Sequence, residues 1–426
     1  MGRRSTWPLQ KRVHKMKQPY VLAMATAIAT VLAASAWAGD VPTSGLAANG
    51  SPGWHMQKGS PDPVGRTIVD VDGKVTVIPR QPGVAGPVGG NVPNCSKSTI
   101  CTRRGGPSRQ VSDRVTWDET MGYSFSYPFH LPAGQGGAPG VALDSKGNVW
   151  VVQRKPDGQP QLFKFDKDAN LVVTVPADVI GYQQKAHGIA VDAQDNVWIT
   201  DTNGATAMQV SPEGKLLRTL GTKEKRGDWD EAKGQQLLWQ PVSVAFAANG
   251  DMYLGEGHAN ESPNDVGSDD PANVVGAARV LRFDKDGKFI SQWFGDDHGA
   301  GKFGEVHGLA VDPKSGEVWV GDREQYRIVI FSAEGKFIRT IQMRNLVCSI
   351  AFDQKGEPWV GTGQDGQVIK IDRAGKILGA VGRGMGIEPG QFIEANYFGF
   401  DKTGTLYVGD TSIGRIAKIS PPAKKR

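Results

Sequence analysis

Two histidines occupy matching places in two similar stretches of the chain. His187 lies in KAHGIAVD and His307 lies in EVHGLAVD, each directly before an alternating apolar run. Imidazole binds zinc and also exchanges protons near neutral pH, so converging histidines suit metal binding or acid–base catalysis. Because a catalytic zinc usually takes three protein ligands, two histidines are only part of a site. His258, in GEGHANES, is the third candidate.

The elements that must position these histidines are six copies of one sequence repeat. Each copy has an alternating apolar stretch, a polar turn and a second stretch with an aromatic residue at a fixed place. Alternating apolar residues place one face of a strand in a core, and Gly, Asn or Asp in the turns suits a tight hairpin. By subtraction of residue numbers, the aromatics are 48, 55, 66, 40 and 48 residues apart. They are Trp150, Trp198, Tyr253, Trp319, Trp359 and Tyr407.

These spacings predict an all-β fold, a six-bladed β-propeller over residues 112–421 with one four-stranded sheet per repeat. The last copy stops after its third strand, at GRIAKIS (414–420). An unpaired strand edge invites aggregation, so another segment must cover it. We expect the stretch DRVTWDE (113–119), on the N-terminal side, to complete the last sheet and close the ring.

The candidate site lies on one face of this predicted ring. The first and second strands of each repeat run in opposite directions, so the residue entering the first and the residue leaving the second share a face. The alternative interpretation is that these polar residues only satisfy turns, above all the recurring aspartates. The residues on this face include His187, His307 and Asn396 at entering positions, and Arg154, Asp201, His258, Asp322, Arg323 and Asp410 at leaving positions.

Residues 1–38 are typical of a secretory signal peptide. Six basic side chains precede the apolar run 20–35, and Ala36-Trp37-Ala38 suits a cleavage site. We therefore expect a secreted or periplasmic protein, with an uncleaved anchor as the alternative. Removing this leader changes the net charge from +5 to about −1, which argues against a nucleic-acid partner. No membrane contact beyond the leader is expected, and we expect a monomer.

Residues 39–111 are rich in Gly and Pro and are expected to be largely irregular, apart from a hairpin at 66–79. In an exported protein, Cys95 and Cys101 are expected to form a local disulfide, and no partner is expected for Cys348. The polar, acidic insertion at 258–278 is expected to be a solvated loop, with a lid or a weak calcium site as alternatives. Residues 422–426 form a basic tail.

Roughly residues 135–420 resemble the NHL-repeat propellers, and among them the peptidyl-α-hydroxyglycine α-amidating lyases. The likeness is strongest from PVSVAF through GKFISQWFG and in GKFGEVHGLAVDPKSGEVWVGDREQYRIVIF. The resemblance implies a zinc ion held by three histidines, each just before an innermost strand, and two of these positions are matched by His187 and His307. At the third position this chain has Asn396, followed by Tyr397 where the family has aspartate. This departure affects two expectations drawn from the family, namely the third zinc ligand and the calcium held in the channel.

The resemblance also implies a set of catalytic residues. Arg154 and Arg323 match the two arginines of the family, while His258 replaces its tyrosine. The substrate would then be a carbinolamide, small or peptidic, with an arginine holding its carboxylate and His258 acting as third ligand or as base. Two functions follow: a lyase-like or hydrolase-like metalloenzyme, or a non-catalytic propeller that binds a protein, peptide or glycan on the same face.

Overall fold

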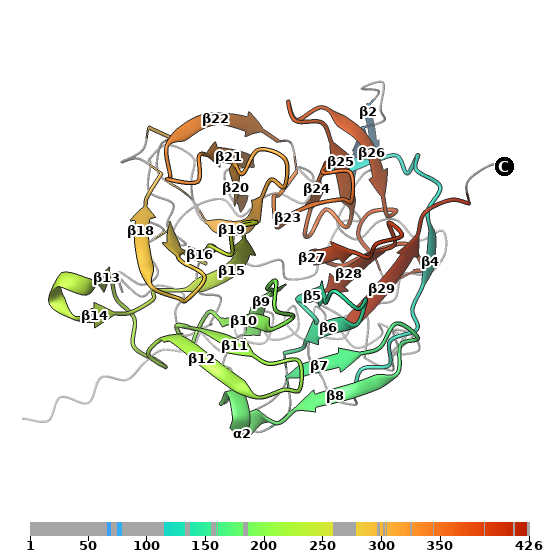
Figure 1. Cartoon of the computed structure of the whole chain (residues 1–426). Helices are drawn as coiled ribbons and strands as arrows, with labels where there is room; N and C mark the ends of the chain where they lie inside the picture. The colour runs from blue at the N-terminus through green and yellow to red at the C-terminus, as the bar shows by residue number, and fades with distance from the viewer. Residues whose placement is uncertain are drawn as a thin grey trace, which may run out of the picture. The chain divides into compact units, whose positions relative to one another are not determined.

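The computed structural model describes residues 66–69, 75–78 and 115–423, apart from gaps at 133–136, 155–158, 160, 182–185, 259–277, 296–298, 301–302, 304, 324–325, 344, 387 and 412–413. All of these residues lie in one compact unit, residues 43–426. Six four-stranded antiparallel sheets are arranged around a central axis (Figure 1). In five of them the strands follow one another outward in chain order, and in the sixth the outermost strand comes from the N-terminal side. The predicted six-bladed β-propeller is therefore confirmed.

The first three blades occupy residues 140–293. Blade 1 contains β5 (Gly140–Leu143), β6 (Val149–Val152), β7 (Leu162–Phe165) and β8 (Leu171–Val175). Blade 2 follows the short helix α2 (Ala177–Ile180) and contains β9 (Ala186–Val191), β10 (Val197–Asp201), β11 (Thr206–Val210) and β12 (Leu216–Gly221). A small hairpin of β13 (Trp229–Asp230) and β14 (Gln235–Gln236) around the 3-10 turn η2 (Glu231–Lys233) precedes blade 3. Blade 3 contains β15 (Pro241–Phe246), β16 (Met252–Glu256), β17 (Arg279–Phe283) and β18 (Phe289–Trp293).

The other three blades complete the ring. Blade 4 contains β19 (Val306–Val311), β20 (Val318–Asp322), β21 (Arg327–Phe331) and β22 (Phe337–Gln342). Blade 5 contains β23 (Ser349–Phe352), β24 (Pro358–Gly361), β25 (Val368–Ile371) and β26 (Ile377–Val381). Blade 6 contains β27 (Ala395–Phe400), β28 (Leu406–Asp410), β29 (Arg415–Ser420) and β4 (Ser124–Ser126). The innermost strands β5, β9, β15, β19, β23 and β27 contact one another in this order, and β27 contacts β5.

The recurring aromatics hold the blades together. Each lies on the second strand of its blade and is at most 3% exposed. Its partner on the innermost strand is small: Trp150 faces Ala142, and Tyr407 faces Gly399. A small partner leaves room for the ring between adjacent sheets. Burying one aromatic side chain removes about 150–250 Å² from water, worth at most about 4–6 kcal/mol.

The ring is closed by a strand from the N-terminal side, as predicted, but not by the predicted segment. Strand β4 pairs with β29 through Ser124 opposite Ser420 and Ser126 opposite Lys418. The prediction that residues 113–119 close the ring is wrong, because their strand β3 (Val115–Trp117) pairs in parallel with β1 (Arg66–Val69). The Trp117 indole donates to Asn345 Oδ1 at 2.7 Å, and the side chain of Gln367 binds the Trp117 backbone N–H and C=O at 2.7 and 2.6 Å. These hydrogen bonds hold β3 beside blade 5, away from the open edge of blade 6.

Several predictions fall on other parts of the chain. The hairpin at 66–79 is confirmed, since β1 pairs in antiparallel fashion with β2 (Val75–Ile78). The leader (1–38), Cys95, Cys101, the insertion residues 259–277 and the tail residues 424–426 lie outside the described residues. Cys348 is buried directly before β23. No helix among the described residues combines the length and the apolar character needed to cross a bilayer.

Candidate metal centre

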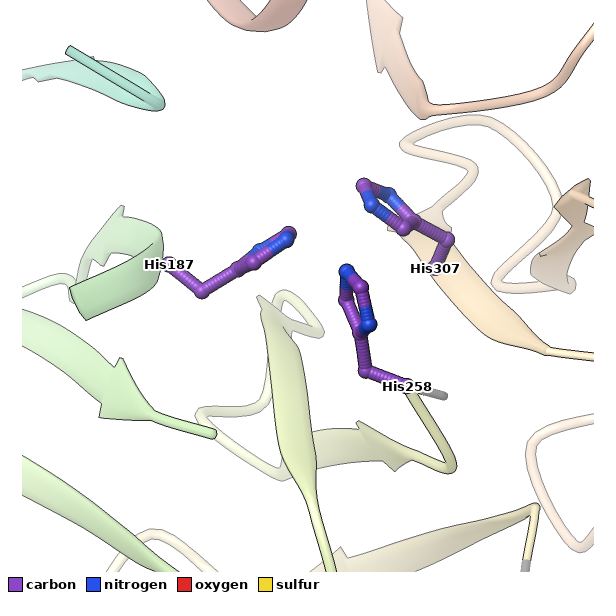
Figure 2. Close-up of side chains that lie close together, drawn as sticks. All are labelled: His187, His258 and His307. Atoms are coloured by element: carbon purple, nitrogen blue, oxygen red, sulfur yellow. The ribbon is translucent and has the colours of Figure 1, made fainter. Parts of the chain in front are cut away.

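Three imidazoles from three different blades point toward one another at the channel (Figure 2). His187 lies in β9 and His307 in β19, while His258 follows β16 by two residues. The ring centroid of His187 is 4.7 Å from those of both other histidines, which are 5.3 Å from each other. All three are at most 2% exposed, and their candidate ligand atoms lie within 4.8 Å of one another. Within the described ranges, this is the one group of at least three His, Cys, Asp or Glu side chains that can hold a metal ion.

β-Bulges at the start of the innermost strands direct two of these imidazoles. In β19, His307 is the extra residue between the pairs Val306–Asp322 and Gly308–Gly321. In β9, the pairing shifts in the same way at His187 and Gly188. A bulge breaks the strict alternation of side chains along a strand and changes the direction of one of them. The bulges at His187 and His307 therefore allow these imidazoles to point toward the channel.

The glycine after each of these histidines allows the next blade to come close. A Cβ on Gly188 would lie 2.0 Å from the carbonyl oxygen of Val242 in blade 3. A Cβ on Gly308 would lie 3.0 Å from the Cα of Ser349 in blade 5. Each His-Gly pair therefore has two roles. The histidine supplies a candidate ligand, and the glycine allows the innermost strand of the adjacent blade to approach closely.

A backbone carbonyl sets the tautomer of His307. Its Nδ1 lies 2.6 Å from the oxygen of Cys348, a distance at which Nδ1–H donates to the carbonyl. A neutral imidazole that donates from Nδ1 carries its lone pair on Nε2. This arrangement is usual for metal-binding histidines, whose second ring nitrogen is held by an outer hydrogen bond.

Tyr397 crosses the channel and contacts two of the histidines. It starts from β27 in blade 6, yet its hydroxyl lies 3.1 Å from the oxygen of Val242 in blade 3 and 2.7 Å from that of His307 in blade 4. Its ring stacks on His307 at 5.8 Å and meets the ring of His187 edge-on at 5.6 Å. Burial raises the pKa of Tyr397 well above its usual value of 10, so the hydroxyl stays protonated and donates to a carbonyl.

Two buried charges border the histidines, and sequence reasoning missed one of them. Glu305 is 1% exposed, and its Oε1 lies 3.5 Å from His258 Nε2 and 3.9 Å from His307 Nε2. The same Oε1 lies 3.4 Å from Nη1 of Arg323, whose Nη2 lies 3.7 Å from Glu394 Oε1. The only available signal was proximity in the chain, because Glu305 lies directly before β19 and two residues before His307.

The remaining predicted residues lie nearby with other partners. Arg154 is partly buried, and its Nε donates at 3.1 Å to the oxygen of Ala186, next to His187. Asn396 is buried in the bulge of β27 and donates through Nδ2 to Thr411 Oγ1 at 3.0 Å. The three aspartates bind loop backbone. Asp201 accepts from the N–H of Gly204, Asp322 from that of Glu305, and Asp410 from that of Ile393, at 2.9–3.0 Å.

The donor set fits a transition-metal ion such as zinc. Zinc binds imidazole nitrogen at about 2.0–2.1 Å with tetrahedral geometry, which separates ligand atoms by about 3.4 Å. The three imidazoles would therefore close by up to about 1.4 Å from their 4.8 Å limit. His307 already has the required tautomer, and burial excludes competing water. The cluster can bind a metal ion on these grounds.

Comparison with known proteins agrees with the fold. A family described as "6-bladed beta-propeller" matches residues 274–360. The peptidyl-glycine alpha-amidating monooxygenase of Mus musculus is 26% identical over 325 residues, covering 67% of this chain and 30% of that protein. NHL repeat-containing protein 3 of Homo sapiens is 24% identical over 212 residues, 46% of this chain and 51% of that protein.

A third relative is named for the lyase alone. A probable peptidyl-alpha-hydroxyglycine alpha-amidating lyase of Caenorhabditis elegans is 22% identical over 208 residues, 45% of this chain and 52% of that protein. The chain thus spans 30% of the mouse protein and about half of the other two relatives. It is a six-bladed β-propeller with distant sequence similarity to the amidating lyases and to NHL-repeat proteins, as the resemblance predicted.

Proposed function

We propose that this propeller is an exported, metal-dependent lyase that cleaves a carbon–nitrogen bond at the mouth of its channel. One observation carries the proposal: three buried imidazoles from blades 2, 3 and 4 converge within 4.8 Å. Distant similarity to the amidating lyases supports the reaction class. The basic and then apolar leader in residues 1–38 supports export to the periplasm or the exterior.

In this proposal the ligands of a zinc ion are His187, His258 and His307. His258 supplies the third imidazole from blade 3, where the family resemblance would take it from the position of Asn396 in blade 6. The number of imidazoles is unchanged, and the site moves toward one side of the ring. Calcium is left out, because Tyr397 stands where the family has aspartate and its hydroxyl already lies against two channel carbonyls.

The substrate is proposed to be an N-acyl-α-hydroxyglycine, a carbinolamide with a carboxylate. When bound, zinc supplies a Lewis acid that polarises the hydroxyl oxygen. The hydroxyl proton leaves, a C=O bond forms, the C–N bond breaks and the amide nitrogen gains a proton, yielding a primary amide and glyoxylate.

Of the two candidate arginines, Arg154 suits the substrate carboxylate better. The Arg323 side chain is 5% exposed and lies between Glu305 and Glu394, so two carboxylates already balance its charge. Arg154 is more exposed, and its Nε is anchored on the residue before His187. A guanidinium held in this way can bind a carboxylate in bidentate fashion.

Metal analysis and turnover of the purified protein test this function. We expect about one zinc per chain in the wild type, loss of zinc in His187→Ala, His258→Ala and His307→Ala, and retention in the control His130→Ala, whose side chain is exposed outside the cluster. We also expect glyoxylate release from an N-acyl-α-hydroxyglycine, with a raised KM in Arg154→Ala. A wild-type protein that holds no metal after loading with zinc overturns the proposal.

The burial of the cluster favours a second candidate. Histidines that are at most 2% exposed suit a metal that ties blades together, with the channel face binding a protein, peptide or glycan. This candidate also predicts zinc in the wild type and its loss in the histidine variants. It differs in turnover: zinc-loaded protein would release no glyoxylate, and the histidine variants would lose stability.

A further inference from the structure

We propose that Glu305 is a fourth protein ligand of the metal centre, so that the ion is held by three imidazoles and one carboxylate. The inference rests on the proposed metal binding by His187, His258 and His307. It adds a residue that the repeat pattern does not single out.

The distances around Glu305 suit two ligands that share one ion. Its Oε1 lies 3.5 Å from His258 Nε2 and 3.9 Å from His307 Nε2. Both separations exceed the 2.7–3.2 Å of an ordinary N–H···O hydrogen bond. They are close to the spacing of about 3.3–3.4 Å between neighbouring ligand atoms on a tetrahedral zinc ion. The carboxylate oxygen therefore lies where a ligand would lie, beside two of the three imidazoles.

The backbone around Glu305 is fixed on both sides. Its N–H donates to Asp322 Oδ1 at 2.9 Å, and its carbonyl accepts from the N–H of Arg323 at 3.1 Å. The other carboxylate oxygen of Asp322 lies 2.8 Å from Arg327 Nε. Outer hydrogen bonds of this kind hold metal ligands in position and reduce the entropy lost on binding.

The local charge also favours a cation at this place. A buried carboxylate costs several kcal/mol unless it is paired. Arg323 provides one positive charge, but it faces both Glu305 and Glu394, at 3.4 and 3.7 Å. With neutral imidazoles, the three groups Glu305, Glu394 and Arg323 together carry a net charge of −1 beside the cluster. A divalent ion at the Nε2 atoms would compensate this charge at short range.

A carboxylate ligand has consequences for metal choice and affinity. Three imidazoles and one carboxylate suit manganese, iron or cobalt as well as zinc, because carboxylate is a harder ligand than imidazole or thiolate. Substrate would then bind by expanding the coordination to five or by displacing the carboxylate. Loss of the ligand is expected to weaken metal binding by about 10–100-fold or more, the range that outer hydrogen-bond partners alone reach.

Titrations of the full-length protein with Zn²⁺ and Co²⁺ test the assignment. Zinc affinity is measured by chelator competition, and the visible spectrum of bound Co²⁺ reports the ligand set. We expect Glu305→Gln to weaken zinc binding at least 10-fold and to change the Co²⁺ spectrum. Glu305→Asp keeps the charge but shortens the reach, so it is also expected to lose affinity. Glu394→Gln, at the other end of Arg323, removes the same charge without removing a ligand, so its zinc affinity is expected to fall less than that of Glu305→Gln and its Co²⁺ spectrum is expected to match the wild type.

Each other outcome has a distinct meaning. If Glu305→Gln folds and binds zinc with wild-type affinity and an unchanged Co²⁺ spectrum, Glu305 is no ligand and the three-histidine site stands. If Glu305→Asp binds like wild type while Glu305→Gln does not, the carboxylate acts through charge alone and the ligand assignment is wrong. If the wild type binds neither ion, the metal centre itself fails, and Glu305 with it.

Discussion

Replacing Tyr397 with phenylalanine removes one oxygen atom from the centre of the ring. The Tyr397 hydroxyl lies 2.7 Å from the oxygen of His307 and 3.1 Å from that of Val242. Val242 keeps a second donor, because Thr200 Oγ1 lies 3.0 Å from the same oxygen. The substitution therefore costs mainly the hydrogen bond to His307, while the aromatic ring and its contacts with the imidazoles remain.

The expected loss of stability in Tyr397→Phe is that of one buried hydrogen bond. Loss of this buried hydrogen bond is expected to cost about 1–3 kcal/mol. Tyr397 is 8% exposed and the hydrogen bond of its hydroxyl to His307 is buried, so the upper half of this range is expected. Tyr397→Ala would also lose the ring, and large-to-small changes of this size cost about 3–5 kcal/mol.

Urea unfolding measures these effects through the midpoint at unchanged m-value. The matched control is Tyr253→Phe, whose hydroxyl donates at 3.0 Å to the half-buried Ala333 carbonyl, which keeps Arg282 as a second donor at 3.0 Å. We expect a loss of about 0.5–1.5 kcal/mol there. Zinc affinity is expected to fall slightly in Tyr397→Phe and strongly in Tyr397→Ala. A Tyr397→Phe protein as stable as wild type would refute the view that the hydroxyl of Tyr397 stabilises the fold by binding carbonyls of blades 3 and 4.

Three further predictions concern the ring. Gly188→Ala places a methyl group 2.0 Å from a carbonyl oxygen of the next blade, so we expect a loss of about 1–3 kcal/mol or more in urea unfolding together with weaker zinc binding. Burial raises the pKa of Asp410 from 3.8 to about 6, so the folded state binds this proton more tightly than the unfolded state does. The free energy of unfolding should therefore fall by about 3 kcal/mol as pH rises from about 4 to 6. Asp410→Asn should lack this pH dependence when its urea unfolding is measured over the same range. Arg279→Leu leaves Glu256 buried without its partner at 2.6 Å, at an expected cost of about 3–5 kcal/mol, whereas Arg339→Leu at a more exposed pair should cost at most about 1 kcal/mol; equal losses would contradict the argument.

The repeat pattern predicted the blades because each blade depends on local interactions. Alternation places apolar side chains on one face of a strand, and the aromatic on the second strand faces a small residue such as Ala142 or Gly399 on the first. These pairs lie within about ten residues of each other in the chain. The spacing of the copies then gave the number of blades, and the number of blades determines that innermost strands meet around one axis.

The same reasoning placed His187 and His307 in the channel, since equivalent positions of equivalent blades point the same way. It was less able to identify the closing strand. Both 113–119 and 124–126 precede the first copy, and the choice between them depends on the contacts of Trp117 with Asn345 and Gln367 more than 220 residues away. No periodicity within the N-terminal segment carries that information.

Taken alone, the sequence determined the fold class, the number of blades and the positions of His187 and His307 at the start of innermost strands, because hydrophobic alternation and hairpin turns act over short distances. Only the tertiary structure decided which side chains meet at the axis. Tyr397 reaches blades 3 and 4 from blade 6, and Glu305 lies beside His258 of another blade. Such contacts depend on bulges that re-aim single side chains and on the closure of the whole ring, and both arise only when all six sheets pack together.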